Sequence, residues 1–245
     1  MTRSPVVLIT GSSRGIGAAT ALYFAKQGYD VCINYKSDLA SAQLVASKVK
    51  SLGVRAQVIK ADVSKEADVL ALFSQIDKEF GQLDVLVNNA GILKPQMPLL
   101  DMNAERINEV LTTNITSAFL CSREAVKRMG NGGSIVNVSS AAAKTGSPNE
   151  YIDYAASKGA IDTLTVGLAK EVASKGIRVN SVRPGLIYTD MHSDGGDKNR
   201  VDRLKNKLPL GRGDKPEEVA AAIYFLASSD AAFTTGSFID VAGGL

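Results

Sequence analysis

The chain has 245 residues, of which 45% are apolar and 22% charged, and its net charge is +3 at pH 7. This length fits one α/β domain, and so small a charge, spread along the chain, gives no indication of a nucleic-acid partner. His192 is the only histidine, which argues against a His-based metal site or a Ser-His-Asp triad; no metal site is suggested.

The chain carries no sign of secretion or of a membrane anchor. Residues 1–5 lead into an apolar run without a signal-peptide core, and no apolar run reaches the ~18 residues of a membrane span. Cys32 and Cys121 lie in apolar runs and are expected to be buried thiols rather than a disulfide. We therefore expect a cytoplasmic protein without a membrane partner.

Short apolar runs alternate with helical patterns from the N-terminus onward. They predict a strand at 6–10 with a helix from 14 to 28, a strand at 31–35 with a helix at 39–52, and a strand at 54–60 with a helix at 65–80. A fourth strand at 84–88 precedes one long helix at 104–129. A fifth strand at 134–139 precedes a helix that reaches residue 175, and a sixth strand spans 177–182.

The remaining C-terminal part departs from this rhythm. Residues 188–208 are polar, contain Gly195-Gly196, and are expected to form a mobile substrate lobe. Asp214 and Glu217 have the spacing of a helix N-cap and its partner, and predict a helix that ends near Ala227. A last short strand is expected near 237–240.

The arrangement of strands and helices predicts the fold class. Gly28, Gly53, Gly81 and Gly176 each follow a predicted helix, which is a typical C-terminal stop signal. Strands that are apolar throughout and separated by helices indicate a parallel sheet covered on both faces. We expect an α/β doubly wound sheet of the Rossmann type, with about seven strands, in a single domain over residues 1–245.

A glycine-rich turn follows the first strand and opens the first helix. Residues 10–17 read Thr-Gly-Ser-Ser-Arg-Gly-Ile-Gly. Glycines let a pyrophosphate approach a helix N-terminus, where free N–H groups and the helix dipole favour anions. The spacing GxxxGxG differs from the general GxGxxG fingerprint, so the position of the turn, rather than its letters, favours a nucleotide site.

The end of the second strand bears on cofactor choice. An acidic residue there is typical of sites that bind the ribose diol of NAD. Here the strand ends in Tyr35 and Lys36, and the first acid is Asp38. Lys36 and Arg14 face a 2′-phosphate in one interpretation and are solvated surface cations in the other. NADP is favoured, and NAD stays open.

Tyr154 and Lys158 lie four residues apart on a predicted helix, so their side chains share one face. A tyrosine hydroxyl ordinarily has a pKa of about 10. A neighbouring ammonium favours the phenolate, and proton transfer is most efficient when the pKa lies near the operating pH. Such a pair can exchange a proton with a substrate oxygen; a surface tyrosine beside a solvated lysine is the alternative interpretation.

These features together resemble one known family. From about Val6 to the C-terminus the chain is similar to the single-domain short-chain dehydrogenases/reductases. The resemblance rests on TGxxxGIG at 10–17, Asp62-Val63, Asn88-Asn89-Ala90-Gly91, Asn114, Ser140, YxxxK at 154–158 and Pro184-Gly185. Any one motif can arise by chance, but the whole set in this order and spacing hardly can.

The resemblance implies roles for four residues. Tyr154 would donate the proton in reduction and accept it in oxidation, and Ser140 would hydrogen-bond the substrate oxygen. Lys158 would hold the nicotinamide ribose and lower the pKa of Tyr154. Asn114 would anchor a water that links Lys158 to solvent.

Two neighbours compete for these roles. Tyr151 is less favoured than Tyr154, because the residue four positions after it is Ala155 rather than a lysine. Ser139 is less favoured than Ser140, the second serine of the pair.

The residues expected to bind the cofactor fall into six segments. Asp62 and Val63 would contact the adenine, residues 88–91 would line the floor of the site, and residues 184–189 would flank the nicotinamide. The full set is Gly11, Ser13, Arg14, Gly15, Ile16, Gly17, Lys36, Asp62, Val63, Asn88, Ala90, Gly91, Tyr154, Lys158, Pro184, Gly185, Ile187 and Thr189.

The expected function is an NADP-dependent oxidoreductase that moves a hydride between the nicotinamide and a carbonyl or secondary alcohol. The alternatives are an NAD-dependent sugar or polyol dehydrogenase, a non-catalytic dinucleotide-sensing protein and a methyltransferase on a related sheet. Residues 93–101, 141–150 and 188–208 should choose the small-molecule substrate. His192 either meets the substrate in the lobe or, as the favoured interpretation, is an exposed bystander. Pairing through the helices at 104–129 and 152–175 and the last strand, as in the family, implies a homotetramer or homodimer.

Overall fold

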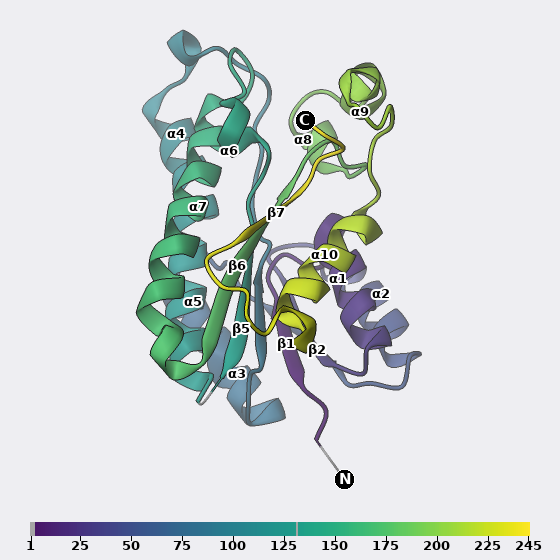
Figure 1. The fold of residues 1–245 in the computed structure, drawn as a ribbon, viewed down its shortest axis with the longest axis vertical. Coiled ribbons are helices and arrows are strands. Elements are labelled where there is room, and N and C mark those ends of the chain that lie inside the picture. Colours follow the sequence, from purple (N-terminus) through teal and green to yellow (C-terminus); the bar gives the residue numbers. More distant parts are fainter. Residues whose placement is uncertain (1–2, 131) are drawn as a thin grey trace.

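A parallel sheet forms the centre of the computed structural model, which describes residues 3–130 and 132–245 (Figure 1). Within these residues seven strands pair in the order β3-β2-β1-β4-β5-β6-β7, all parallel. The predicted doubly wound Rossmann-type fold is confirmed. The strands are β1 (Val6–Ile9), β2 (Asp30–Tyr35), β3 (Ala56–Lys60), β4 (Val85–Asn88), β5 (Gly133–Val138), β6 (Ile177–Pro184) and β7 (Phe238–Val241).

Helices cover both faces of this sheet. The α-helices are α1 (Gly15–Lys26), α2 (Leu39–Lys50), α3 (Glu66–Phe80), α4 (Ala104–Leu111), α5 (Ser117–Arg128), α6 (Ala142–Thr145), α7 (Ile152–Val172), α8 (Met191–Asp194), α9 (Arg200–Leu204) and α10 (Pro216–Ala227). Shorter helical turns are η1 (Leu99–Asp101), η2 (Thr112–Thr116), η3 (Ala173–Lys175), η4 (Lys205–Lys207) and η5 (Ser229–Ala231). The four glycines predicted to end helices all have positive φ.

The alternation of side chains along β1 divides the core into two layers. Val7 and Ile9 pack in one cluster with α1, α2 and α10, whereas Val6 and Leu8 pack in the other with α3, α5 and α7. Figure 1 shows these two groups of helices on opposite sides of the sheet. Because all four side chains are fully buried, β1 is apolar without interruption, as a central parallel strand must be.

The carboxyl ends of the strands bring the predicted site segments together. β1 and β4 are neighbours, although the connections that follow them lead to opposite sides of the sheet, and ligands bind at such a switch point in open α/β sheets. The glycine turn follows β1, residues 89–91 follow β4, Ser139-Ser140 follows β5, and Gly185 follows β6. Segments far apart in the sequence therefore share one edge.

The predicted long helix at 104–129 is wrong in one respect. A π-helical turn, η2, separates α4 from α5. Asn114 lies in this turn, and its side chain bonds the backbone of Ile92 at 2.8 and 3.1 Å. A wide turn of this kind often marks a functional site inside a helix.

The predicted cap of α10 is displaced by one residue. Lys215, rather than Asp214, is the N-cap, and Glu218, rather than Glu217, returns its carboxylate to the cap N–H at 3.1 Å. Pro216 explains the shift, because proline is favoured at the first position of a helix.

Residues 188–208 fold into α8, α9 and η4 above the carboxyl edge of the sheet (Figure 1). The segment is less polar in effect than its composition predicts, since Val201 and Leu208 are buried against Leu186. An isolated bridge between Ile187 and Asp214 fixes its base. No helix in the described part of the chain is long and apolar enough to cross a membrane.

Candidate functional site

A polar clamp holds the glycine turn against the end of β4. The Thr10 Oγ1 accepts hydrogen bonds from the backbone N–H groups of Asn89 and Ala90, both at 3.0 Å. The Asn89 side chain donates to the carbonyls of Thr10 and Gly11, and the Gly11 N–H donates to Asn34 Oδ1 at 3.1 Å. The turn is thus fixed by side chains from two neighbouring strands.

The turn leaves the start of α1 open to an anion. A Cβ on Gly15, whose φ is +55°, would lie 3.4 Å from the Thr189 Cγ2. A Cβ on Gly17 would lie 2.6 Å from both Asn89 Nδ2 and the Gly11 carbonyl oxygen. Among the described residues no side chain caps α1, and its first turn holds no acid, so its N–H groups remain available to a phosphate.

A groove of about 460 Å³ extends from this turn past the ends of β2 and β3. We call it the glycine-turn groove. Eleven of the predicted cofactor residues line it: Gly11, Ser13, Arg14, Gly15, Ile16, Lys36, Asp62, Val63, Ala90, Gly91 and Thr189. A helix start with free N–H groups beside a groove of this size is what a dinucleotide cofactor would require.

The two cations expected at a 2′-phosphate both have carboxylate partners. Lys36 Nζ lies 2.9 Å from Asp62 Oδ2, and Arg14 Nη2 lies 2.5 Å from Asp194 Oδ2 in α8. Both cationic side chains are more than half exposed, so each can also reach a ligand. Asp38, the first acid after β2, caps α2 by accepting hydrogen bonds from Ser41 at 2.9 and 2.6 Å.

A second, smaller cavity of about 150 Å³ continues from the groove, and we call it the Tyr154 cavity. Four residues line both spaces: Ile16, Asn89, Thr189 and Met191. Predicted site residues in the Tyr154 cavity are Ile16, Ser140, Tyr154, Lys158, Pro184, Gly185, Ile187 and Thr189. A ligand that fills the groove therefore meets a molecule held beside Tyr154.

Ser140 is the serine that contacts Tyr154. Its hydroxyl hydrogen-bonds the phenol and accepts from the Ala142 N–H at 3.1 Å. Burial nevertheless raises the pKa of Tyr154 to about 12, with the bond to Ser140 acting in the opposite direction. Tyr154 is therefore protonated at neutral pH and poised to donate.

Lys158 does not lower the pKa of Tyr154 as expected. Its ammonium lies 5.5 Å from the centre of the Tyr154 ring and donates to the Val138 carbonyl at 2.7 Å. Burial also lowers the pKa of Lys158 itself to about 8, opposed by the charge of Asp162. Desolvation thus shifts both pKa values toward the neutral form of each group.

The competing tyrosine and serine have other partners. The buried Tyr151 hydroxyl donates to the Gly195 carbonyl at 3.0 Å and so attaches α7 to the lobe at 188–208. The buried Ser139 hydroxyl donates to the Lys158 carbonyl at 3.1 Å. Both residues support the site without presenting a free hydroxyl to the Tyr154 cavity.

Three predicted site residues line neither space within the described chain: Gly17, Asn88 and Asn114. Asn88 is buried and donates to Ser122 and Asn137 at 3.0 and 2.9 Å. Asn114 donates to Ser157 at 3.0 Å. A Cβ on Gly91 would lie 3.3 Å from Asn114 Oδ1 and 3.6 Å from Lys158 Nζ, so both side chains approach the same glycine.

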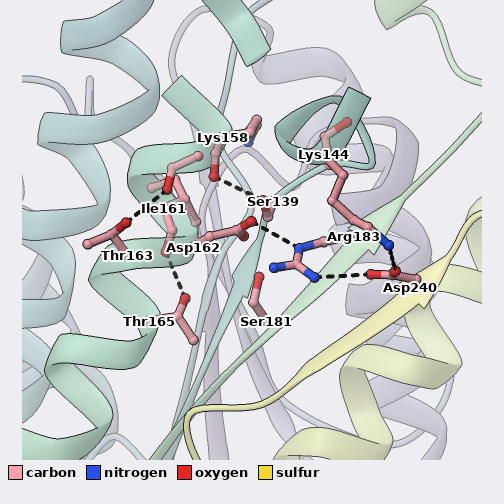
Figure 2. A network of polar contacts seen from close by, with 12 residues as sticks. Ser139, Lys144, Lys158, Ile161, Asp162, Thr163, Thr165, Ser181, Arg183 and Asp240 are labelled. Carbon is pink, nitrogen blue, oxygen red and sulfur yellow. Dashed lines mark hydrogen bonds and ion pairs between the residues drawn. The ribbon is translucent and has the colours of Figure 1, made fainter. Parts of the chain in front are cut away.

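Ion pairs brace the helix that carries Tyr154. Asp153 accepts from the Tyr154 N–H at 2.9 Å and from Arg106 Nε at 2.8 Å. On the other side of α7, Figure 2 shows Asp162 paired with Arg183, which also contacts Asp240 at the sheet edge. These contacts fix α7 relative to α4, β6 and β7.

His192 is not the exposed bystander expected from the sequence. It lines the Tyr154 cavity together with Met191 and Arg200, and burial lowers its pKa. Its place in the cavity lining agrees with the less favoured interpretation, in which His192 meets the substrate. The two cysteines, both in the described chain, are buried free thiols as predicted.

The chain's sequence and fold match known proteins over nearly their full length. A family model described as "Enoyl-(Acyl carrier protein) reductase" matches residues 11–245. The crystal structure of a short-chain type dehydrogenase/reductase from Mycobacterium marinum superposes with a TM-score of 0.93 and 34% identity, covering 98% of this chain and 94% of that one. The chain belongs to the short-chain dehydrogenase/reductase family. The predicted resemblance is confirmed.

Further relatives agree. "Uncharacterized oxidoreductase YgfF" of Escherichia coli is 57% identical over 98% of this chain and 99% of its own length. A 3-oxoacyl-[acyl-carrier-protein] reductase, FabG, of Staphylococcus aureus is 37% identical over 100% of this chain and 98% of its own length. A putative short-chain dehydrogenase/reductase from Burkholderia xenovorans has a TM-score of 0.89 at 34% identity, covering 100% of this chain and 99% of its own. The chain is an oxidoreductase of this NAD(P)-dependent family.

Proposed function

We propose that this short-chain dehydrogenase/reductase is an NADP-dependent reductase of carbonyl compounds, reversible toward secondary alcohols, with Tyr154 as acid and base. One observation carries the proposal: Ser140, Tyr154 and Lys158 line a cavity that opens from the glycine-turn groove. The function requires a substrate oxygen beside an acid and a dinucleotide in the adjoining space.

Each residue of the site has a separate role in the reaction. In reduction, Ser140 and Tyr154 hydrogen-bond the carbonyl oxygen, and the phenol then gives it a proton. A bound nicotinamide cofactor supplies the hydride. Lys158 holds the ribose of the bound cofactor through its buried ammonium group. Oxidation of an alcohol reverses these transfers, and Asn114 anchors a water that connects Lys158 to solvent.

The remaining predicted residues form the cofactor site. The helix start behind Gly15 and Gly17 holds the pyrophosphate, Asp62 and Val63 the adenine, and Pro184 to Thr189 the nicotinamide. The absence of an acid at the end of β2 and the exposure of Arg14 and Lys36 favour NADP. NAD remains the second candidate, because carboxylates already pair with both cations.

The substrate is a small molecule that enters beside residues 93–101, 141–150 and 188–208. The similarity to FabG supports an oxoacyl thioester, whereas a sugar or polyol dehydrogenase fits the same chemistry. We propose one catalytic domain with a lobe at 188–208 that moves to admit substrate. The cytoplasmic location predicted from the sequence remains part of this proposal.

A homotetramer or homodimer fits an apolar face on α5 and α7. A wide groove there is lined by Ile115, Phe119, Val126, Leu164 and Leu168, and Phe119 is 52% exposed. Large exposed apolar patches mark interaction sites. Sedimentation velocity of the wild type and of Phe119→Glu tests this; a monomeric wild type would contradict it.

A screen of ketones, aldehydes, oxoacyl thioesters and polyols with each cofactor tests the function. The nicotinamide absorbance band reports turnover. The proposal predicts reduction of at least one carbonyl with NADPH, and loss of that reduction in Tyr154→Phe. Turnover only with NADH would still support carbonyl reduction but would overturn the assignment of NADP as the cofactor.

A further inference from the structure

Two nitrogen atoms in the wall of the Tyr154 cavity lack hydrogen-bond partners. His192 Nδ1 and Arg200 Nη1 are both buried, and no protein group in the described chain bonds either one. Both residues line the same cavity as Ser140 and Tyr154. Buried polar atoms are nearly always hydrogen-bonded in folded proteins, so an unmatched pair in a ligand cavity points to a ligand group.

Arg200 is held rigidly in this wall. Its side chain is only 12% exposed, and its Cζ lies 5.0 Å from the centre of the buried Tyr151 ring. Nη2 donates to Glu150 Oε2 at 2.5 Å. The ion pair satisfies the charge of the guanidinium and leaves Nη1 as a fixed donor.

His192 supplies the opposite hydrogen-bonding character. Burial and the charge of Arg200 lower its pKa, opposed by a bond with the Ile187 backbone and by Asp197. With its proton on Nε2, the ring leaves Nδ1, which has no partner in the described chain, free to accept a hydrogen bond. The neutral ring therefore presents a lone pair at Nδ1, which is an acceptor.

We propose that Arg200 and His192 form a subsite for a hydroxyl group of the substrate, separate from the oxygen that reacts at Tyr154. A hydroxyl accepts from Arg200 Nη1 and donates to His192 Nδ1, so it satisfies both atoms at once. A carboxylate would satisfy the arginine but would face the lone pair of a neutral imidazole, and Glu150 already balances the charge. This inference rests on the proposed reductase function and names its substrate class: hydroxylated carbonyl compounds and the matching diols.

Matched ketones test the subsite. The series is 4-hydroxy-2-butanone, 5-hydroxy-2-pentanone and 6-hydroxy-2-hexanone, each against its parent 2-alkanone, with 4-oxopentanoate as the anionic probe. The best hydroxyketone should exceed its parent about tenfold in kcat/KM, as one added pair of hydrogen bonds predicts. Equal values across the series, or a preference for 4-oxopentanoate, would overturn the subsite.

Variants assign the preference to its residues. His192→Phe should reduce the ratio of hydroxyketone to alkanone to about one, whereas His192→Asn, which keeps an acceptor, should retain part of it. Arg200→Met should act like His192→Phe. Arg203→Met, in the same helix but outside the cavity lining, is the control and should leave the ratio unchanged. An unaltered ratio in His192→Phe would also overturn the subsite.

Binding separates this inference from the proposed function. Calorimetric titration of 1,4-pentanediol against 2-pentanol, with NADP⁺ present, should show about tenfold tighter binding of the diol, lost in His192→Phe. This result would support the subsite even if no ketone were reduced, an outcome that would overturn the reductase function alone. Equal affinities would reject the subsite whatever the turnover.

Discussion

Arg14 and Asp194 join the glycine turn to helix α8, with Arg14 Nη2 2.5 Å from Asp194 Oδ2. The two residues are 180 positions apart in the sequence. Their pair bridges the cofactor side of the site and the lobe at 188–208. A ligand phosphate that binds Arg14 must therefore compete with Asp194.

This competition predicts that substitutions of Arg14 and of Asp194 change the affinity for NADPH in opposite directions. Arg14→Ala should weaken NADPH roughly ten- to a hundredfold, because a charge-assisted hydrogen bond contributes about 1.5–3 kcal/mol, and should affect NADH much less. Asp194→Asn releases Arg14 and should tighten NADPH several-fold. Fluorescence titration measures both, with Lys26→Ala at the far end of α1 as control. Equal losses for both cofactors in Arg14→Ala would show that no 2′-phosphate is bound there.

Gly15→Val should weaken cofactor binding without unfolding the protein. Gly15 has φ +55°, which a β-branched residue resists, and the new side chain would meet Thr189. NADPH affinity should fall at least tenfold in a folded variant. Gly28→Ala is the matched control, since Gly28 also has positive φ but no described residue lies within 4 Å of its Cβ position. If the Gly15 variant binds normally, the turn is only structural.

The lowered pKa of Lys158, about 8, predicts a pH limit for the reaction. As the pH rises through 8 the lysine loses its charge, so kcat/KM for NADPH, which reports the free enzyme, should decline. Lys158→Arg keeps the charge and should move this decline to higher pH, whatever its absolute rate. Identical pH profiles would remove Lys158 from the titration.

Glu124 predicts a stability change in acid. Its side chain is 3% exposed; burial opposes ionisation, but hydrogen bonds from Lys127, Arg128 and Arg123 lower its pKa to about 2. A lowered carboxyl pKa stabilises the fold above the unfolded value of about 4.5, and this contribution is lost as the pH falls toward 2.

Urea unfolding at several pH values tests this stability change. At pH 7, Glu124→Gln should lower the free energy of unfolding by about 1–3 kcal/mol, and the difference from wild type should shrink below pH 4.5. The exposed Glu171→Gln is the control. A difference that does not vary with pH would contradict the assignment.

Sequence patterns predicted the parts of this protein that depend on local rules. The apolar strands, the glycine helix stops and the glycine turn are each encoded within a few residues. Ser140 and Tyr154 follow from motif spacing and lie in contact in the structure. The pairing of Arg14 with Asp194 could not be foreseen, because it depends on where the lobe at 188–208 folds.

Long-range packing also explains the other differences between the structure and the sequence-based predictions. The π-turn at Asn114 forms where its amide meets the Ile92 backbone, a contact invisible in a helical pattern. Burial, rather than sequence spacing, sets the direction of the pKa shifts of Tyr154, Lys158 and His192. The spacing of Tyr154 and Lys158 predicts that they share one face of the helix, but it does not predict how deeply each side chain is buried.

The role of Tyr154 as proton donor is decided by the turnover of Tyr154→Phe on the best carbonyl substrate with NADPH. The variant should bind NADPH as the wild type does and lose about 10²–10⁴-fold in kcat, the range of a general acid. Tyr151→Phe is the matched control, because that hydroxyl bonds Gly195, and it should lose far less. Near-normal turnover in Tyr154→Phe, or the larger loss in Tyr151→Phe, would contradict the assignment of Tyr154 as the proton donor.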